Sequence, residues 1–251
     1  MQSGSIVMRR VRGAVGLLWG VALTLAAGGV AAAGGGTEPA ALEGATRVAQ
    51  APRCQAPEET AAYRVTFTST WSAATHPEGF PPDAHFSDLI GATHSAGWVM
   101  WAEGGLASPG IEQMAERGKS SPLDREVETA IRAGLAGTWL GGGGIRRSPG
   151  SVSLDFRVSR AFSYVSLVSM LAPSPDWFVG VAGLDLCEKQ RWLMERTVVL
   201  YAYDAGTDSG TVYDAPNADT QPRERITRVE GPPFQVAGEV RPVGTFTFTR
   251  R

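Results

Sequence analysis

Cysteine, histidine and net charge are all scarce in this sequence. Its 251 residues include 2 cysteines and 3 histidines, and the formal net charge is −2 without any long basic block. Two cysteines exclude a disulfide-dense miniprotein and a metal site built from four thiolates. A near-neutral chain has no electrostatic basis for holding a phosphate backbone, so we expect no nucleic-acid partner.

One long uncharged apolar run stands near the N-terminus, at residues 14–30, after Arg9, Arg10 and Arg12 and before three alanines at 31–33. This order is typical of a secretory signal peptide, cut after Ala33. The run is slightly short for a membrane helix, which needs about 20 residues, so a retained anchor is the alternative. We expect a secreted or extracytoplasmic protein, periplasmic if the cell has an outer membrane.

The remaining chain divides into a spacer and one domain. Residues 34–53 are rich in alanine and glycine without an apolar period, which is typical of a flexible spacer. Residues 54–251 are enough for a single domain with its own core. Removing residues 1–33 takes away three arginines and no acid, so the formal charge changes from −2 to −5.

Strand patterns dominate this domain. Several segments alternate apolar and polar residues, as half-buried strands do, and others are denser apolar runs typical of central strands covered on both faces. The alternating segments are 63–71, 151–158 and 243–249, the dense runs are 164–171 and 197–203, and shorter candidates are 97–101 and 177–181.

Helix signals are fewer and fall together. We expect a helix in which Ser121 caps, Pro122 occupies the first position and Asp124 completes a capping box. Its apolar stripe is Leu123, Val127, Ile131 and Leu135. A weaker helical turn is expected at 111–117. Helices inserted as one block among many short strands favour an all-β class, an antiparallel β-sandwich with one or two short helices.

Acidic residues in two predicted loops suit a hard cation. Asp204 and Asp208 lie four residues apart beside Gly206 and Gly210, which allow tight turns, and Asp176 follows the previous dense run. If these loops share one end of the sandwich, three carboxylates converge, and Ca²⁺ prefers such oxygen ligands. The alternative is that aspartate and glycine only make turns here.

Other catalytic or metal-binding patterns are weaker. His76, His85 and His94 are nine residues apart, a spacing that matches no zinc signature, so surface turns are the simpler interpretation. The sequence contains no Gly-x-Ser-x-Gly elbow, and neither cysteine has a histidine beside it. An extracytoplasmic hydrolase that uses a metal or carboxylates stays open as the alternative function.

The two cysteines, Cys54 and Cys187, are expected to pair because an exported protein meets an oxidising compartment. The bridge would join the start of the domain to the sandwich. Two free buried thiols are the alternative.

Several short motifs, taken in their order, resemble the spondin domain of animal extracellular-matrix proteins, over about residues 61–250. The segments that carry the resemblance are YRVTF at 63–67, THP at 75–77, HFSDLIG at 85–91, VSLVSM at 165–170, PSPDW at 173–177, LDLC at 184–187 and DAGTDSG at 204–210.

The resemblance implies an antiparallel sandwich similar to calcium- and phospholipid-binding domains, with one Ca²⁺ held between loops at one end. It implies that Asp176, Asp204 and Asp208 are the calcium carboxylates and that Cys187 pairs with Cys54. The sequence carries no thrombospondin repeat or reelin-like module, so matrix assembly and integrin binding are not carried over. We expect a non-enzymatic, secreted calcium-binding protein for adhesion to an extracellular protein or glycan.

Overall fold

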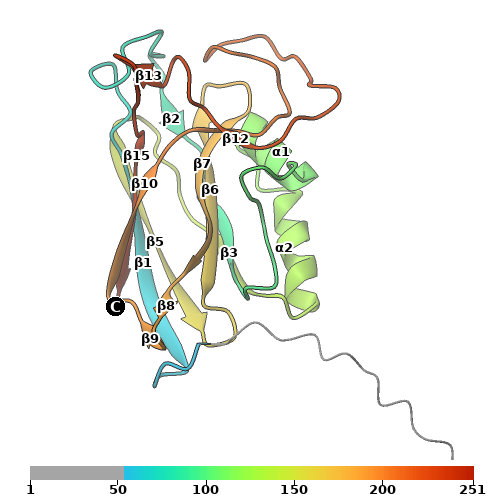
Figure 1. The fold of residues 1–251 in the computed structure, drawn as a ribbon, viewed down its shortest axis with the longest axis vertical. Coiled ribbons are helices and arrows are strands. Elements are labelled where there is room, and N and C mark those ends of the chain that lie inside the picture. Colours follow the sequence, from blue (N-terminus) through green and yellow to red (C-terminus); the bar gives the residue numbers. More distant parts are fainter. Residues whose placement is uncertain (1–53) are drawn as a thin grey trace, which may run out of the picture. The chain divides into compact units, whose positions relative to one another are not determined.

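Two β-sheets pack face to face, and two helices cover the outer side of one of them (Figure 1). The structure is a computed structural model and describes residues 54–251. The predicted signal peptide and spacer, 1–53, lie outside the described residues. No helix of the described part is both long and apolar enough to span a membrane.

The first sheet has four antiparallel strands in the order β10-β15-β1-β5. Its inner face is made by alternate residues, because successive side chains of a strand point to opposite faces. In β1, Tyr63, Val65 and Phe67 are fully buried, while the outward Arg64 pairs with Asp155 of β5 at 2.6 Å. The strands are β1 Thr60–Ser69, β5 Gly150–Ser159, β10 Glu195–Leu200 and β15 Gly244–Arg250.

The second sheet has the order β12-β11-β7-β6-β3-β4, and β2 pairs with the end of β6. Strand β6 lies between the first sheet and the helices, so every residue after Tyr164 in it is buried. The strands are β2 His85–Phe86, β3 Ile90–His94, β4 Ala136–Gly141, β6 Tyr164–Ala172, β7 Trp177–Asp185, β11 Tyr203–Asp204 and β12 Thr227–Arg228.

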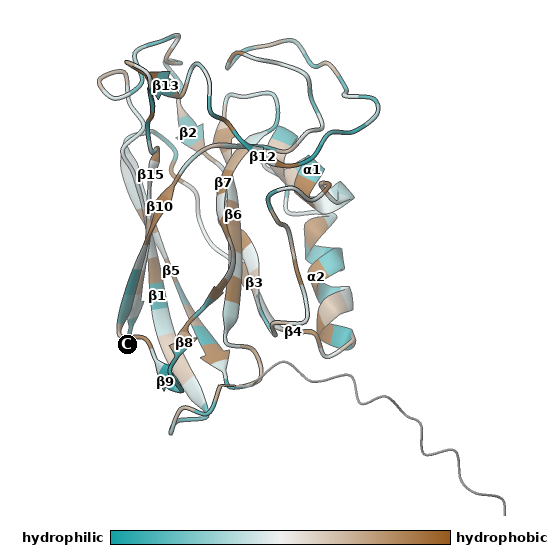
Figure 2. Ribbon diagram, viewed as in Figure 1, coloured by the Kyte–Doolittle hydropathy of each residue, from teal (hydrophilic) through white to brown (hydrophobic). Residues whose placement is uncertain are grey.

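Helices α1 (Pro109–Arg117) and α2 (Leu123–Arg132) form a third layer. Ile111 and Val127 pack with Phe178 of β7 in a core separate from the one between the sheets. Figure 2 shows apolar colour concentrated on β6 and β7, the strands that contribute to both cores. These two cores explain why an all-β sandwich carries helices on one side only.

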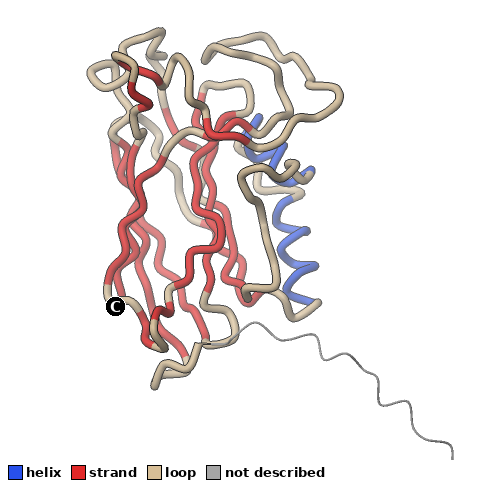
Figure 3. Tube along the Cα trace, in the orientation of Figure 1, coloured by secondary structure: helices blue, strands red, loops and turns tan. Residues whose placement is uncertain are grey.

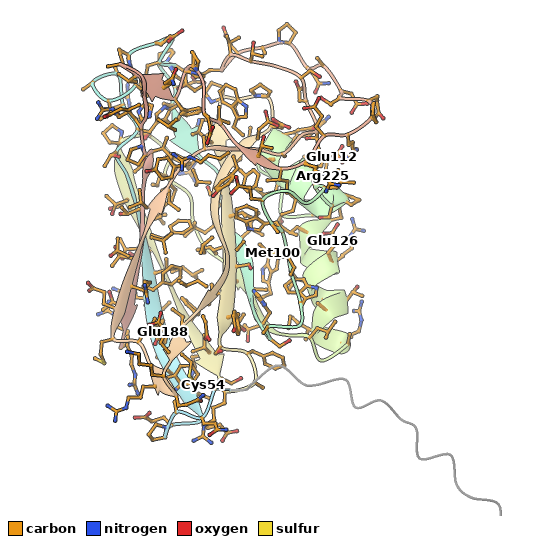
Figure 4. The ribbon with its side chains drawn as sticks, in the orientation of Figure 1. Cys54, Met100, Glu112, Glu126, Glu188 and Arg225 are labelled. Carbon is orange, nitrogen blue, oxygen red and sulfur yellow. A yellow bond between two sulfur atoms is a disulfide. The ribbon has the colours of Figure 1, made fainter. Side chains whose placement is uncertain are left out.

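A disulfide joins Cys54 to Cys187 and confirms the predicted pairing. Cys187 starts a small hairpin, β8 (Cys187–Glu188) with β9 (Arg191–Trp192), and the Trp192 indole donates to the Glu58 carbonyl at 2.9 Å. Figure 4 shows Cys54 and Glu188 at the same end of the domain. A second small hairpin pairs β13 (Gln235–Val236) with β14 (Glu239–Val240).

The all-β sandwich with two short helices is confirmed, but the predicted helix start is wrong. The N-cap of α2 is Pro122, with no side-chain cap, and the Asp124 carboxylate accepts the N–H of Arg125. Helix α2 also ends at Arg132, so Leu135 lies beyond it and is 39% exposed. The capping box does not form because the Asp124 N–H, which the Ser121 side chain was expected to accept, donates to the Ser120 carbonyl at 2.9 Å instead.

Two strand predictions are also wrong. The dense run 197–203 is not one central strand, because β10 is an edge strand of the first sheet and β11 belongs to the second. Leu200 and Ala202 are buried where the chain crosses between the sheets, which accounts for the apolar density. Segment 97–101 is a loop whose Met100 and Trp101 pack into the core under the helices.

Candidate metal centre

The three predicted aspartates come together at one end of the second sheet. Strand β11 pairs with β7 so that Asp204 lies opposite Trp177, the residue after Asp176. The N–H groups of Thr207 and Asp208 donate to Oδ2 of Asp176 at 2.7 and 3.1 Å. The loop that follows β11 therefore wraps around the Asp176 carboxylate.

This loop turns tightly because of its glycine and its aspartates. Gly206 has a φ of +73°, and a Cβ there would overlap the backbone carbonyl of Glu224. Asp204 Oδ1 accepts the Gly206 N–H at 2.7 Å, and Asp208 accepts N–H groups of Gly210 and Ala218 at 2.8 and 3.0 Å. Asx turns are thus real here, as the alternative interpretation of the sequence expected.

Turns alone do not account for Asp176. Its side chain is fully buried, and its Oδ1 has no hydrogen-bond partner among the described residues. Burial, with the nearby Asp204 carboxylate, raises the pKa of Asp176 to about 7, although the N–H groups of Thr207 and Asp208 oppose the rise. A cation or a proton would neutralise this buried carboxylate and give its unpartnered oxygen a partner.

Neighbouring carboxylates reinforce the negative charge. Burial raises the pKa of Asp204, and the charges of Glu224 and Asp208 add to the rise while the Gly206 N–H opposes it. Burial also raises the pKa of Glu116 on α1, and the carboxylates of Glu112 and Asp208 contribute. At this end of the sheet the pKa values of Asp176, Asp204 and Glu116 are therefore all raised, because burial and neighbouring carboxylates disfavour the charged form.

The loop that carries these acids is anchored to α1 and to the segment before it. Almost all of the chain between β11 and β12 is loop (Figure 3). Arg223 forms an ion pair with Glu112, and Arg225 donates to the Gly104 carbonyl at 2.6 Å. Figure 4 labels Glu112 and Arg225 in the region where α1 meets this loop. These anchors hold the loop near the aspartates.

The donor set fits a hard cation in its chemistry. Carboxylate and carbonyl oxygens are the ligands of Ca²⁺, and the unpartnered Oδ1 of Asp176 is free to bind one. Within residues 54–251, no three His, Cys, Asp or Glu side chains are already arranged around a common metal position. The aspartates instead hold backbone N–H groups, so coordination would use their remaining lone pairs.

The three histidines do not meet. His85 pairs with Ala172 and His94 with Tyr164, eight residues apart along β6, which is about 26 Å at the rise of a strand. His76 is buried against Phe234. A shared zinc site from His76, His85 and His94 is excluded by these positions.

A serine and a histidine do lie within hydrogen-bond distance, and the sequence did not indicate it. His94 Nε2 is 2.9 Å from Ser166 Oγ across the β3–β6 pairing, 72 positions apart in the chain. His94 is 2% exposed and Ser166 is fully buried, and Ser166 Oγ also accepts the Gly183 N–H at 2.9 Å. No substrate reaches this oxygen without opening the sheet, so the pair holds strands together.

These features define a class: a disulfide-linked, two-sheet antiparallel sandwich with an acidic cluster in the loops at one end. Comparison with known proteins gives the family. The family model described as Spondin_N matches residues 61–235, and the chain belongs to the spondin family.

Two relatives give the extent of the similarity. Spondin-2 of Homo sapiens is 39% identical over 173 residues, which are 67% of this chain and 52% of Spondin-2. Spondin-1 of Rattus norvegicus is 39% identical over 176 residues, 66% of this chain and 21% of Spondin-1. The chain therefore matches about half of one relative and a fifth of the other.

Proposed function

We propose that this protein is a secreted, non-enzymatic spondin-domain protein that binds Ca²⁺ through Asp176, Asp204 and Asp208. In this proposal the ion orders the loops at one end, and the domain binds an extracellular protein or glycan in adhesion. The single observation that carries it is the buried, unpartnered Oδ1 of Asp176 beside a second carboxylate.

Three further features support the proposal. The chain belongs to the spondin family. The resemblance of its sequence to that family already implied that these three aspartates are calcium ligands. The Cys54–Cys187 disulfide suits an oxidising, extracytoplasmic compartment. Among the described residues, the side-chain groups that act on Asp176 are the Asp204 carboxylate and the Thr207 hydroxyl, and such oxygen ligands favour Ca²⁺ over zinc.

The proposal predicts that Ca²⁺ stabilises the folded chain. A ligand that binds only the native state raises its stability, by about 2.7 kcal/mol at a concentration of 100 times Kd. The test is the thermal midpoint of residues 34–251 in excess chelator and in millimolar Ca²⁺, with Mg²⁺ as the comparison ion. We expect a Ca²⁺-dependent rise that is lost in Asp208→Ala.

The matched control is Asp214→Ala, since Asp214 is an exposed acid of the same loop region. It should keep the full response. An equal response in Asp208→Ala, or no response in the native chain, would contradict the assignment of the site.

A further inference from the structure

A polar pocket whose lining includes none of the three aspartates lies beside β2. It has a volume of about 860 Å³, within the usual range for ligand sites. Three segments and Met170 of β6 line it: the segments are residues 82–88 around β2, the end of α1, and the loop 143–147 after β4. Their contact is close, because a Cβ added at Gly118 would be 2.9 Å from the Cβ of Ser87.

The walls of this pocket are rich in arginine. Arg117 comes from α1, and Arg146 and Arg147 come from the loop, all three exposed. Among the described residues, no side chain forms an ion pair or hydrogen bond with Arg146 or Arg147, although Asp83 and Asp88 line the same pocket. The guanidinium groups are therefore available to a ligand.

The pocket lining contains more arginines than acidic residues, although the net charge of the whole chain is negative. Arg117 makes only a long contact with Glu116, at 3.9 Å. Guanidinium groups bind sulfate, phosphate and carboxylate through two parallel N–H bonds, which lysine does not match. The pocket is thus suited to an oxyanion in spite of the overall charge.

The remaining lining adds partners for hydroxyl groups. The side chains of Asp83 and Asp88 accept no hydrogen bond from the rest of the described chain, so they can accept from a ligand hydroxyl. His85 donates Nδ1–H to the Asp83 carbonyl at 2.7 Å, which fixes the orientation of its ring at the pocket wall. Acceptors beside guanidinium donors suit a ligand that carries both acid groups and hydroxyls.

We propose that this pocket binds the acidic sugars of an extracellular polysaccharide, through sulfate or carboxylate groups on Arg146, Arg147 and Arg117. The choice of an extracellular polysaccharide depends on the secreted binding role proposed above. Asp83 and Asp88 then accept sugar hydroxyls, and the mainly polar walls exclude a purely apolar ligand. The site shares no residue with the acidic cluster at Asp176.

The experiment is calorimetric titration of residues 34–251 with four probes: a heparin-derived octasaccharide, an oligogalacturonate, a neutral dextran oligomer and sodium sulfate. We expect at least one of the two acidic oligosaccharides, the heparin-derived octasaccharide or the oligogalacturonate, to bind. The neutral dextran oligomer should not bind. The double variant Arg146→Gln, Arg147→Gln should weaken that binding at least tenfold. Both side chains are exposed and have no partner among residues 54–251, so the thermal midpoint of the variant should not change.

The control is Arg125→Gln, Arg191→Gln, which removes the same charge from exposed positions outside the pocket. It should keep the affinity within threefold. Equal losses in both double variants would show a general charge effect and overturn the proposal. Failure of both acidic oligosaccharides to bind, or binding of sulfate alone as tightly as the oligosaccharide, would also overturn it.

Each titration is repeated with Ca²⁺ and with chelator, beside the thermal midpoint. A Ca²⁺ response without oligosaccharide binding refutes the arginine pocket and leaves the calcium role supported. Oligosaccharide binding that depends on Arg146 and Arg147 but has no accompanying Ca²⁺ response supports the pocket and refutes the calcium role.

Discussion

Replacing Asp176 by asparagine should change stability in opposite directions with and without Ca²⁺. The carboxyl is buried, and its pKa is raised from an ordinary 3.8 to about 7. The folded state therefore binds this proton more strongly than the unfolded chain does. In the calcium-free protein, stability is lost as pH rises from about 4 through about 7.

The size of the loss follows from the shift. About three pKa units at 1.36 kcal/mol each make the ionised Asp176 unfavourable by about 4 kcal/mol at pH 8. Asparagine has the same shape, carries no charge, and keeps an oxygen for the N–H groups of Thr207 and Asp208. In chelator at pH 8, we expect Asp176→Asn to be more stable than the native chain by up to about 4 kcal/mol.

Calcium should reverse the order. It neutralises the carboxylate of the native chain, whereas asparagine lacks the charge that holds the ion. The assay is denaturant unfolding followed by tryptophan fluorescence at pH 5 and pH 8, in chelator and in Ca²⁺, with Asp214→Asn as the control. The reasoning is refuted if Asp176→Asn is less stable than the native chain in chelator at pH 8, or if Ca²⁺ stabilises both equally.

Three other predictions concern stability alone. Replacing Cys54 and Cys187 by serine should lower the free energy of unfolding by up to about 5 kcal/mol, measured in denaturant, because the disulfide spans 133 positions. Burial lowers the pKa of His94, so the folded state disfavours the protonated ring. The contribution of the neutral ring to the free energy of unfolding is therefore complete above about pH 6.5 and is lost as the pH falls below that value. His94→Gln should flatten this part of the pH–stability curve. Gly206→Ala should lower the thermal midpoint more than Gly238→Ala does, because both have positive φ but only Gly206 lacks room for a Cβ. Equal effects at the two glycines would show that strain alone matters.

The local pattern of the sequence was enough to predict most strands and the acidic cluster. Alternation in 63–67 predicts which side chains of β1 turn inward, since a strand's two faces differ whatever packs on them. Asp204 and Asp208 were predictable because both follow a strand in a glycine-containing loop. The cysteine pair was predictable from its number and from the expected compartment.

Partners that are distant in the chain could only come from the tertiary structure. The sequence of the run 197–203 reveals that it is rich in apolar residues. It does not reveal that the chain crosses from one sheet to the other within this run, because the pairing of each strand depends on segments far away in the chain. His94 meets Ser166 through the β3–β6 register, and Arg117 and Arg146 line one pocket because the end of α1, at Gly118, lies against Ser87. A sequence determines which face of an element must be buried. How all the layers pack together decides which other element buries that face and which polar groups are left without a partner there.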